Sequence, residues 1–290
     1  MNKIESVSLG NGKALRQDDV FPTSEVKDLS NLLNCRVRKG IEKGIFSNGA
    51  LVNVVSKGYS HLRNEDFFLE VEAKLIEAEL NYVTRSINRE DRSFSVSYLL
   101  SDDSYVVKVK NSTDEIVPML NFINSYDGSC RTSGSFGFFR KVCANGLHVA
   151  KSKFGFAVKH RGDVAKVVIP EIKTMVNKFM DNEFYSLSKK FVVLAERPLV
   201  DVEGFVKLTA DQLNLFQYES SEKNPLPSLN ARQVIDTIYK ESSLLGSVPT
   251  LWNGYNAVNE LLHNKLKKTF AQQAKIDLQL FNFVSELSTN

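Results

Sequence analysis

The segment from Ser125 to Arg161 contains the residues whose types and spacing could do chemistry. Between positions 128 and 161 the sequence has seven cationic side chains, five phenylalanines and no carboxylate. Cations can follow a phosphate backbone, and aromatic faces stack on unpaired bases for about 1–3 kcal/mol each. We therefore expect a surface that binds nucleic acid, formed by Arg131, Phe136, Phe138, Phe139, Arg140, Lys141, Lys151, Lys153, Lys159 and Arg161.

An alternative explains the same segment without a ligand. Phe136 and Phe138 are two residues apart, as are Phe154 and Phe156, and this spacing places each pair on one face of a strand. The phenylalanines would then belong to the core, with the cations on the solvated face. The absence of acids favours binding, because a solvated face usually mixes signs. The rest of the chain mixes charges of both signs. Residues 1–127 carry 16 basic and 19 acidic side chains, and residues 162–290 carry 14 basic and 15 acidic side chains.

The Asp127-Gly128-Ser129 run could hold a metal or supply a nucleophile. An Asp-Gly pair more often forms a turn, in which the aspartate accepts backbone N–H bonds. We therefore predict that Asp127, Gly128 and Ser129 form a structural turn. Cys143 and His148 are close in sequence, but a catalytic Cys/His pair usually meets only in the fold. A small buried hydrophobic residue is the simpler interpretation of Cys143.

Other catalytic signatures are missing from the sequence. The four histidines lack metal-ligand spacing, and no P-loop, dinucleotide-binding, zinc-protease or nucleophile-elbow motif is present. A metal-dependent nuclease would need clustered carboxylates, which are dispersed along this sequence. Three cysteines without a C-x-x-C pair argue against a disulfide framework and a structural zinc site. We expect no metal, no cofactor and no catalytic residue, and we favour a protein that is not an enzyme.

The composition is that of a folded protein. The chain has 290 residues, of which 42% are hydrophobic and 24% charged, enough for one large domain or two smaller ones. The first residues lack the apolar region of a secretory signal. No apolar run approaches the roughly 20 residues that span a bilayer. We expect a cytoplasmic protein without a membrane partner.

Local patterns predict the N-terminal elements that position this segment. Residues 1–22 are polar and read as a flexible arm. Thr23-Ser24 could cap a short helix through Leu33, and Asn48-Gly49 is a strong hairpin signal. Asn64 is a suitable N-cap, and apolar residues at helical spacing predict a helix from about 65 to 80.

Period-two patterns follow this helix. Residues 94–100 and 105–109 alternate around a turn, which predicts a hairpin with one solvated side. Further strands are expected at Val117–Ser125, Ser135–Val142 and Phe154–His160. After Gly162 the apolar spacing becomes helical.

The order of these elements predicts an α+β fold: an N-terminal curved antiparallel sheet with a packed helix, followed by a mainly α-helical C-terminal part. The expected domains are the arm 1–22, a sheet domain 23–162 and a helical part 163–290. The stretch from Thr250 to Glu260 holds the only tryptophan and reads as a helix start that packs in the core. Its alternative is an aromatic contact at a subunit or ligand surface.

Three motifs resemble a known family. They are Asn124-Ser125-Tyr126-Asp127-Gly128-Ser129, the run from Arg140 to Leu147, and, more loosely, the run from Trp252 to Val258. These runs are similar to the phage- and plasmid-borne proteins classed as domain of unknown function 932. The resemblance implies a setting of phage replication, recombination or counter-defence, and it carries over no catalytic residue.

Three functions remain as hypotheses. The first is a non-catalytic protein that binds or anneals single-stranded DNA in replication or recombination, as a homo-oligomeric ring or filament. Phage annealing proteins, which are small α+β proteins that oligomerise and bind DNA in a basic groove, are the precedent. The second is a counter-defence or regulatory factor that binds a host or phage protein. The third and least favoured is a metal-dependent nuclease that uses Asp127.

Overall fold

The structure is a computed structural model. It describes residues 5–6, 21, 23–89, 93–109, 114–141, 146–147, 155–179, 184–221, 224–268 and 270–289. The chain forms two compact units. Unit 1 comprises Met1–Tyr105, Pro118–Phe136 and Ser152–Asp181, and unit 2 comprises Val106–Val117, Gly137–Lys151 and Asn182–Asn290. The division therefore differs from the expected boundary near residue 162, because the chain passes several times from one unit to the other. Most of the predicted arm lies outside the described residues.

The main sheet has the order β1-β5-β6-β8-β9-β10, with β11 paired to β9 and β7 paired to β8. Its strands are β1 (Glu5–Ser6), β5 (Tyr82–Arg89), β6 (Ser93–Leu100), β7 (Val107–Lys108), β8 (Glu115–Ser125), β9 (Thr132–Arg140), β10 (Gly146–Leu147) and β11 (Phe156–Val158). The strands expected near 117–125, 135–142 and 154–160 are present as β8, β9 and β11. The predicted α+β class, with an antiparallel sheet first and helices after it, is confirmed.

The predicted hairpin between residues 94–100 and 105–109 is wrong. Strand β6 pairs with β5 on one side and with β8 on the other, while β7 pairs with β8. The intervening chain forms a short 3-10 helix, Asp103–Tyr105. As an inner strand, β6 is buried on both faces along most of its length. The alternating pattern alone could not predict that both faces of β6 are buried, because the elements that pack on a strand decide whether its second face is solvated.

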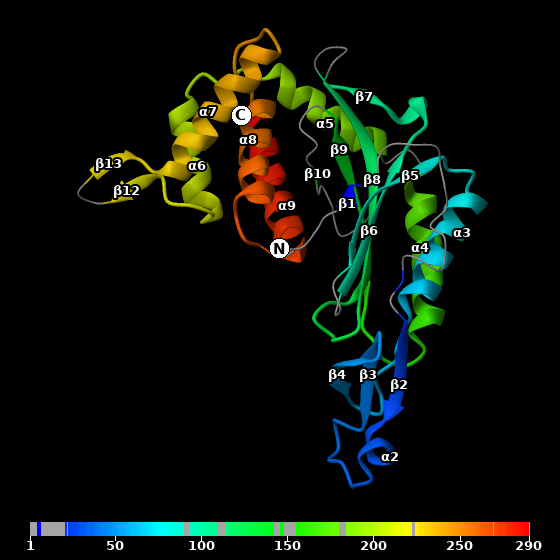
Figure 1. The fold of residues 1–290 in the computed structure, drawn as a ribbon. Helices are drawn as coiled ribbons and strands as arrows, with labels where there is room; N and C mark the ends of the chain where they lie inside the picture. The colour runs from blue at the N-terminus through cyan, green and yellow to red at the C-terminus, as the bar shows by residue number, and fades with distance from the viewer. Residues whose placement is uncertain are drawn as a thin grey trace. The chain divides into compact units, whose positions relative to one another are not determined.

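Helices α3 (Asn64–Glu77) and α4 (Val164–Lys178) lie side by side against the sheet of unit 1 (Figure 1). Phe67 and Phe68 of α3 contact Phe122 and Phe94 of the sheet, with ring centroids 6.1 and 4.9 Å apart. The helix predicted from about 65 to 80 is therefore confirmed. Its expected N-cap is not, because Asn64 is the first helical residue and its side chain is buried.

A second, three-stranded sheet of unit 1 has the order β2-β3-β4. Its strands are β2 (Ser24–Asp28), β3 (Lys43–Ser47) and β4 (Ala50–Val55), and the short helix α2 (Leu29–Leu33) follows β2. The Asn48-Gly49 hairpin is confirmed, with φ of 48° and 79° at its two turn residues. The helix expected to begin at Thr23-Ser24 begins later, because Asp28 rather than Thr23 caps it.

Unit 2 is mainly helical, as expected for the C-terminal part. Its helices are α5 (Phe184–Glu196), α6 (Val202–Leu213), α7 (Leu229–Leu244), α8 (Leu251–Asn264) and α9 (Phe270–Leu287). Trp252 at the start of α8 is fully buried, between Phe191 of α5 and Tyr255. The predicted packing role of this helix start therefore holds for Trp252. Among the described residues, no helix is long and apolar enough to span a membrane.

Candidate nucleic-acid interface

The connection from β8 to β9 in unit 1 is a tight turn. The Asp127 side chain accepts a 2.8 Å hydrogen bond from the Ser129 backbone N–H, and Gly128 has a φ of 71°. Below the turn, the Ser125 hydroxyl donates to the Cys130 carbonyl oxygen at 2.8 Å. Asp127 thus bonds the backbone of its own turn, which is how an aspartate stabilises such a conformation.

A buried polar network anchors this turn to the rest of unit 1. The Asn124 side chain donates to the Leu62 carbonyl and to Asn64 Oδ1, each at 2.9 Å. It also accepts a 2.9 Å bond from the Thr132 hydroxyl, whose oxygen lies 3.3 Å from His160 Nε2. Asn124 is fully buried, so these bonds replace those that water would otherwise make. One side chain therefore ties β8 and β9 to the start of α3.

An aromatic stack lies beside the network. The rings of Tyr59 and His160 are parallel to within 7°, with centroids 5.0 Å apart. The Tyr59 hydroxyl donates to the Ser125 carbonyl at 3.3 Å, and its backbone forms an antiparallel bridge with Arg161. Burial raises the pKa of Tyr59, and the negative charge of Asp127 adds to the rise. Tyr59 is only partly buried, so part of its ring remains accessible to a ligand.

Three predicted cations gather at this place. In the β9/β11 ladder Thr132 faces Val158, so Arg131 and Lys159 are the next positions outward on the two strands. Arg161 follows two residues later, at its bridge with Tyr59. All three side chains are exposed, and none forms an ion pair within the described part of the chain. We call Arg131, Lys159 and Arg161 the basic end.

The predicted phenylalanines lie elsewhere. Phe136 is 3% exposed and packs on Phe179 in unit 1, with centroids 5.6 Å apart. Phe138 is fully buried and packs on Phe191 in unit 2 at 4.9 Å. Phe139 is partly buried. In this structure the rings of Phe136 and Phe138 contribute to the core, as the alternative interpretation of their spacing expected.

The remaining predicted cations do not join the basic end. Lys141 is exposed and forms a 2.8 Å ion pair with Glu115 in unit 2. Arg140 is buried in the same unit. Lys151 and Lys153 lie outside the described residues, as do Cys143 and His148.

Arg140 belongs to a buried charge cluster of unit 2. Its guanidinium makes two bonds to Asp114, at 2.7 and 3.0 Å, and reaches both carboxylate oxygens of Glu241 at 2.9 Å. The Trp252 indole N–H donates to Asp114 at 2.8 Å, and the Arg140 guanidinium lies 5.3 Å from the Trp252 ring centroid. Burial raises the pKa of Glu241, and Arg140 offsets part of that rise. The cluster joins two of the sequence motifs inside one unit.

Sequence reasoning missed a serine–histidine pair in unit 1. Ser24 Oγ lies 2.9 Å from His61 Nε2, and the His61 ring lies 4.9 Å from that of Tyr126. His61 Nδ1 is buried without a hydrogen-bond partner among the described residues. No carboxylate therefore orients the ring there, and the pair lacks the third member of a hydrolase triad. No sequence signal could have found it, because the two residues come from separate elements.

The burial of His61 predicts a pH dependence. Burial, followed by the charges of His160 and Arg63, lowers the pKa of His61 to about 4 from its ordinary 6.5, and burial also lowers the pKa of His160. The unfolded chain then binds the proton first, so stability falls as the pH drops from about 6.5 to about 4. The His61 share is about 1 kcal/mol after solvent screening.

The variant His61→Gln should therefore flatten the pH dependence of unit 1 stability over this range. Urea unfolding followed by far-UV circular dichroism at several pH values measures it. Identical slopes for the variant and the wild type would show that His61 titrates normally.

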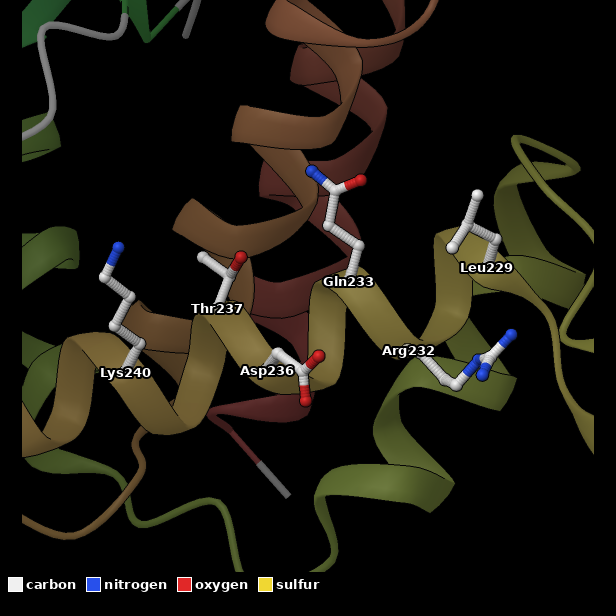
Figure 2. Close-up of a pocket in the computed structure, with 6 residues that line it drawn as sticks. All are labelled: Leu229, Arg232, Gln233, Asp236, Thr237 and Lys240. Atoms are coloured by element: carbon white, nitrogen blue, oxygen red, sulfur yellow. The ribbon is translucent and has the colours of Figure 1, made fainter.

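An open hollow with a volume of about 370 Å³ lies along α7 of unit 2, as Figure 2 shows. Its lining residues all come from that helix: Leu229, Arg232, Gln233, Asp236, Thr237 and Lys240. The charges there are of both signs, so the hollow favours no single ligand class. No group of three or more histidine, cysteine or acidic side chains that could hold a metal occurs within the described ranges.

The comparisons with known proteins give one match. The family model described as Domain of unknown function (DUF932) matches residues 51–279, which include all the motifs singled out above. No curated protein and no solved structure matches the chain.

Proposed function

The chain belongs to the family described as Domain of unknown function (DUF932), a description that assigns no activity, and we propose that it binds single-stranded nucleic acid without catalysis. Its setting would be a phage or mobile element, with binding or annealing of DNA in replication or recombination. The binding surface is the basic end of unit 1. Of the residues predicted to contact nucleic acid, Arg131, Lys159 and Arg161 keep that role here.

One observation carries the proposal. Arg131, just before β9, and Lys159 and Arg161, just after β11, lie beside the stacked rings of Tyr59 and His160 and form no ion pair with any described residue. Cations that lack a carboxylate partner are available to phosphates, and binding then gains from the release of counterions. A partly accessible tyrosine offers a face or edge on which an unpaired base can stack. The buried Asn124 network holds these groups in place before the ligand arrives, which lowers the entropic cost of binding.

The expected result is that the triple variant Arg131→Glu, Lys159→Glu, Arg161→Glu loses at least about tenfold in affinity for an oligonucleotide. Fluorescence anisotropy with a labelled oligo-dT measures this. Each phosphate contact contributes about 0.7 to the slope of log affinity against log salt for a single strand, so the slope should fall by about 2. The matched control is Lys189→Glu, Arg232→Glu, Lys240→Glu, which reverses three exposed cations of unit 2.

Equal losses in both triple variants would mean that net charge, and not the basic end, governs binding. A wild type that binds neither DNA nor RNA oligonucleotides at low salt would remove the proposal. A strand-annealing assay with complementary labelled strands separates annealing from simple binding. Parallel titrations with RNA show which nucleic acid is preferred.

The alternative function is a counter-defence or regulatory factor that binds another protein. Exposed aliphatic side chains favour it, because the small sheet of unit 1 leaves several leucines uncovered. It predicts a stable complex with a host or phage protein that survives nuclease treatment. A complex that nuclease treatment dissociates would instead indicate that nucleic acid bridges the two proteins.

A further inference from the structure

The small sheet of unit 1 has an uncovered apolar face. Leu29 and Leu51 close over Gly44, each with a methyl carbon 2.9 Å from the position that a Gly44 Cβ would take. Val54 pairs with Gly44 and therefore lies on the same face. Leu32 and Leu33 follow Leu29 by three and four residues in α2 and extend this face. We call Leu32, Leu33, Leu51 and Val54 the apolar face; they are 52%, 59%, 51% and 37% exposed.

The surroundings of the apolar face are positively charged. Arg36, Arg38 and Lys39 are exposed in the loop that follows α2, and they form no ion pair within the described residues.

The three carboxylates of residues 23–57 are already engaged. Glu25 pairs with Lys27 at 2.6 Å, Asp28 caps α2, and Glu42 accepts two backbone N–H bonds. A partner that is apolar and acidic would therefore match this surface.

Unit 2 has a projecting hairpin that is both apolar and acidic. Strands β12 (Glu219–Ser221) and β13 (Asn224–Pro227) form a two-stranded hairpin that projects from α6 and α7 (Figure 1). Leu226 on the hairpin and Leu229 just after it are 65% and 74% exposed. A hairpin of two short strands is marginally stable alone in water, so a docking partner would stabilise it.

The base of the hairpin is acidic. The Tyr218 hydroxyl donates a 3.5 Å hydrogen bond to Glu203 Oε2, and Glu219 follows Tyr218 as the first residue of β12, so two carboxylates lie at this base. Lys207, 3.7 Å from Glu219, balances only one of them. The hairpin therefore combines exposed leucines with a carboxylate at its base, Glu203, that forms no ion pair among the described residues, which suits the apolar face and its cationic loop.

We propose that the β12–β13 hairpin of one copy docks on the apolar face of a second copy. The two surfaces differ, so the contact is heterologous and repeats from copy to copy, giving a ring if the rotation closes and a filament if it does not. Aliphatic side chains offer no stacking face to bases, which favours a protein occupant over nucleic acid. The two prolines of β13 lack N–H groups, so side chains rather than strand pairing make the contact. The inference rests on the proposed function and refines the homo-oligomeric ring or filament that was expected from the sequence.

The test uses the full chain and light scattering coupled to size exclusion at micromolar concentration. The face variant is Leu32→Ser, Leu51→Ser, and the hairpin variant is Leu226→Ser, Leu229→Ser. Wild type is expected to form oligomers and each variant to be monomeric. In an equimolar mixture, the intact hairpin of the face variant can dock on the intact apolar face of the hairpin variant. No second contact is possible, so the mixture should form dimers and nothing larger. The control Val200→Ser, Leu208→Ser, at two exposed positions of unit 2, should leave the oligomers unchanged.

A monomeric wild type would overturn the inference, and so would oligomers that persist in the face variant or the hairpin variant. A mixture that stays monomeric would also overturn it, because the two variants would then not carry complementary surfaces. Both variants keep the basic end, so oligonucleotide binding by their monomers is measured separately. Assembly can fail while binding holds, and binding can fail while assembly holds.

Discussion

Replacing Arg140 by methionine is expected to lower the free energy of unfolding of unit 2 by about 3–5 kcal/mol. Methionine fills a similar volume but leaves Asp114 and Glu241 without their cation in a site where Arg140 is 1% exposed. The Trp252 indole can still donate to Asp114, which compensates for only part of the loss. The large cost comes from two uncompensated carboxylates, not from the attraction within the intact cluster.

Urea unfolding followed by tryptophan fluorescence measures this effect, because the only tryptophan lies in the cluster itself. The control Lys141→Met removes the neighbouring cation, whose ion pair with Glu115 is exposed, and should cost less than about 1 kcal/mol. The pKa of Glu241 is already raised, and losing Arg140 raises it further. The difference between Arg140→Met and the wild type should therefore shrink as the pH falls into the acidic range, because protonation of Glu241 removes one of the two uncompensated charges. A difference that is small at neutral pH would show that the cluster relaxes without Arg140.

The local parts of the fold could be predicted from the sequence. Asn48-Gly49 specifies its hairpin through two residues that tolerate positive φ, and the apolar spacing of α3 is a property of one segment. The burial of both faces of β6 could not be predicted, because it depends on pairing with β8, which follows it along the chain, and on packing against α3. An alternating pattern indicates a solvated face only where other elements cover one face of the sheet and leave the second face uncovered.

The candidate site shows the limit of counting charges along a sequence. The acid-free stretch from 128 to 161 indicated a binding surface, yet carboxylates outside that stretch pair with two of its cations. Asp114 and Glu241 bind Arg140, and Glu115 binds Lys141. The charges of neighbouring residues in the sequence thus did not predict the charges of neighbouring side chains in the fold. Strand register selected the three cations that remain unpaired among the described residues, and register was not readable from composition.

Removing the Asn124 side chain with Asn124→Ala is expected to destabilise unit 1 by about 2–4 kcal/mol. The change leaves the Leu62 carbonyl, Asn64 Oδ1 and the Thr132 hydroxyl without their shared partner in a fully buried place. Each buried polar group that loses its bond costs about 1–3 kcal/mol, and local relaxation recovers part of this. Hydrogen exchange of the β8 and β9 amides measures the loss, because the tryptophan signal reports on unit 2.

Two further variants sharpen this prediction. Asn31→Ala, an exposed asparagine of the same unit, should change stability by less than about 0.5 kcal/mol. Asn124→Asp can still accept from Thr132 but places a carboxylate against the Leu62 and Asn64 oxygens, so it should be at least as damaging at neutral pH. Its deficit relative to the wild type should shrink at acidic pH, because a protonated aspartate can donate one of the two lost bonds. Protection of the β8 and β9 amides that is equal in Asn124→Ala and the wild type would mean that the network does not hold the turn, and the basic end would then lack its rigid support.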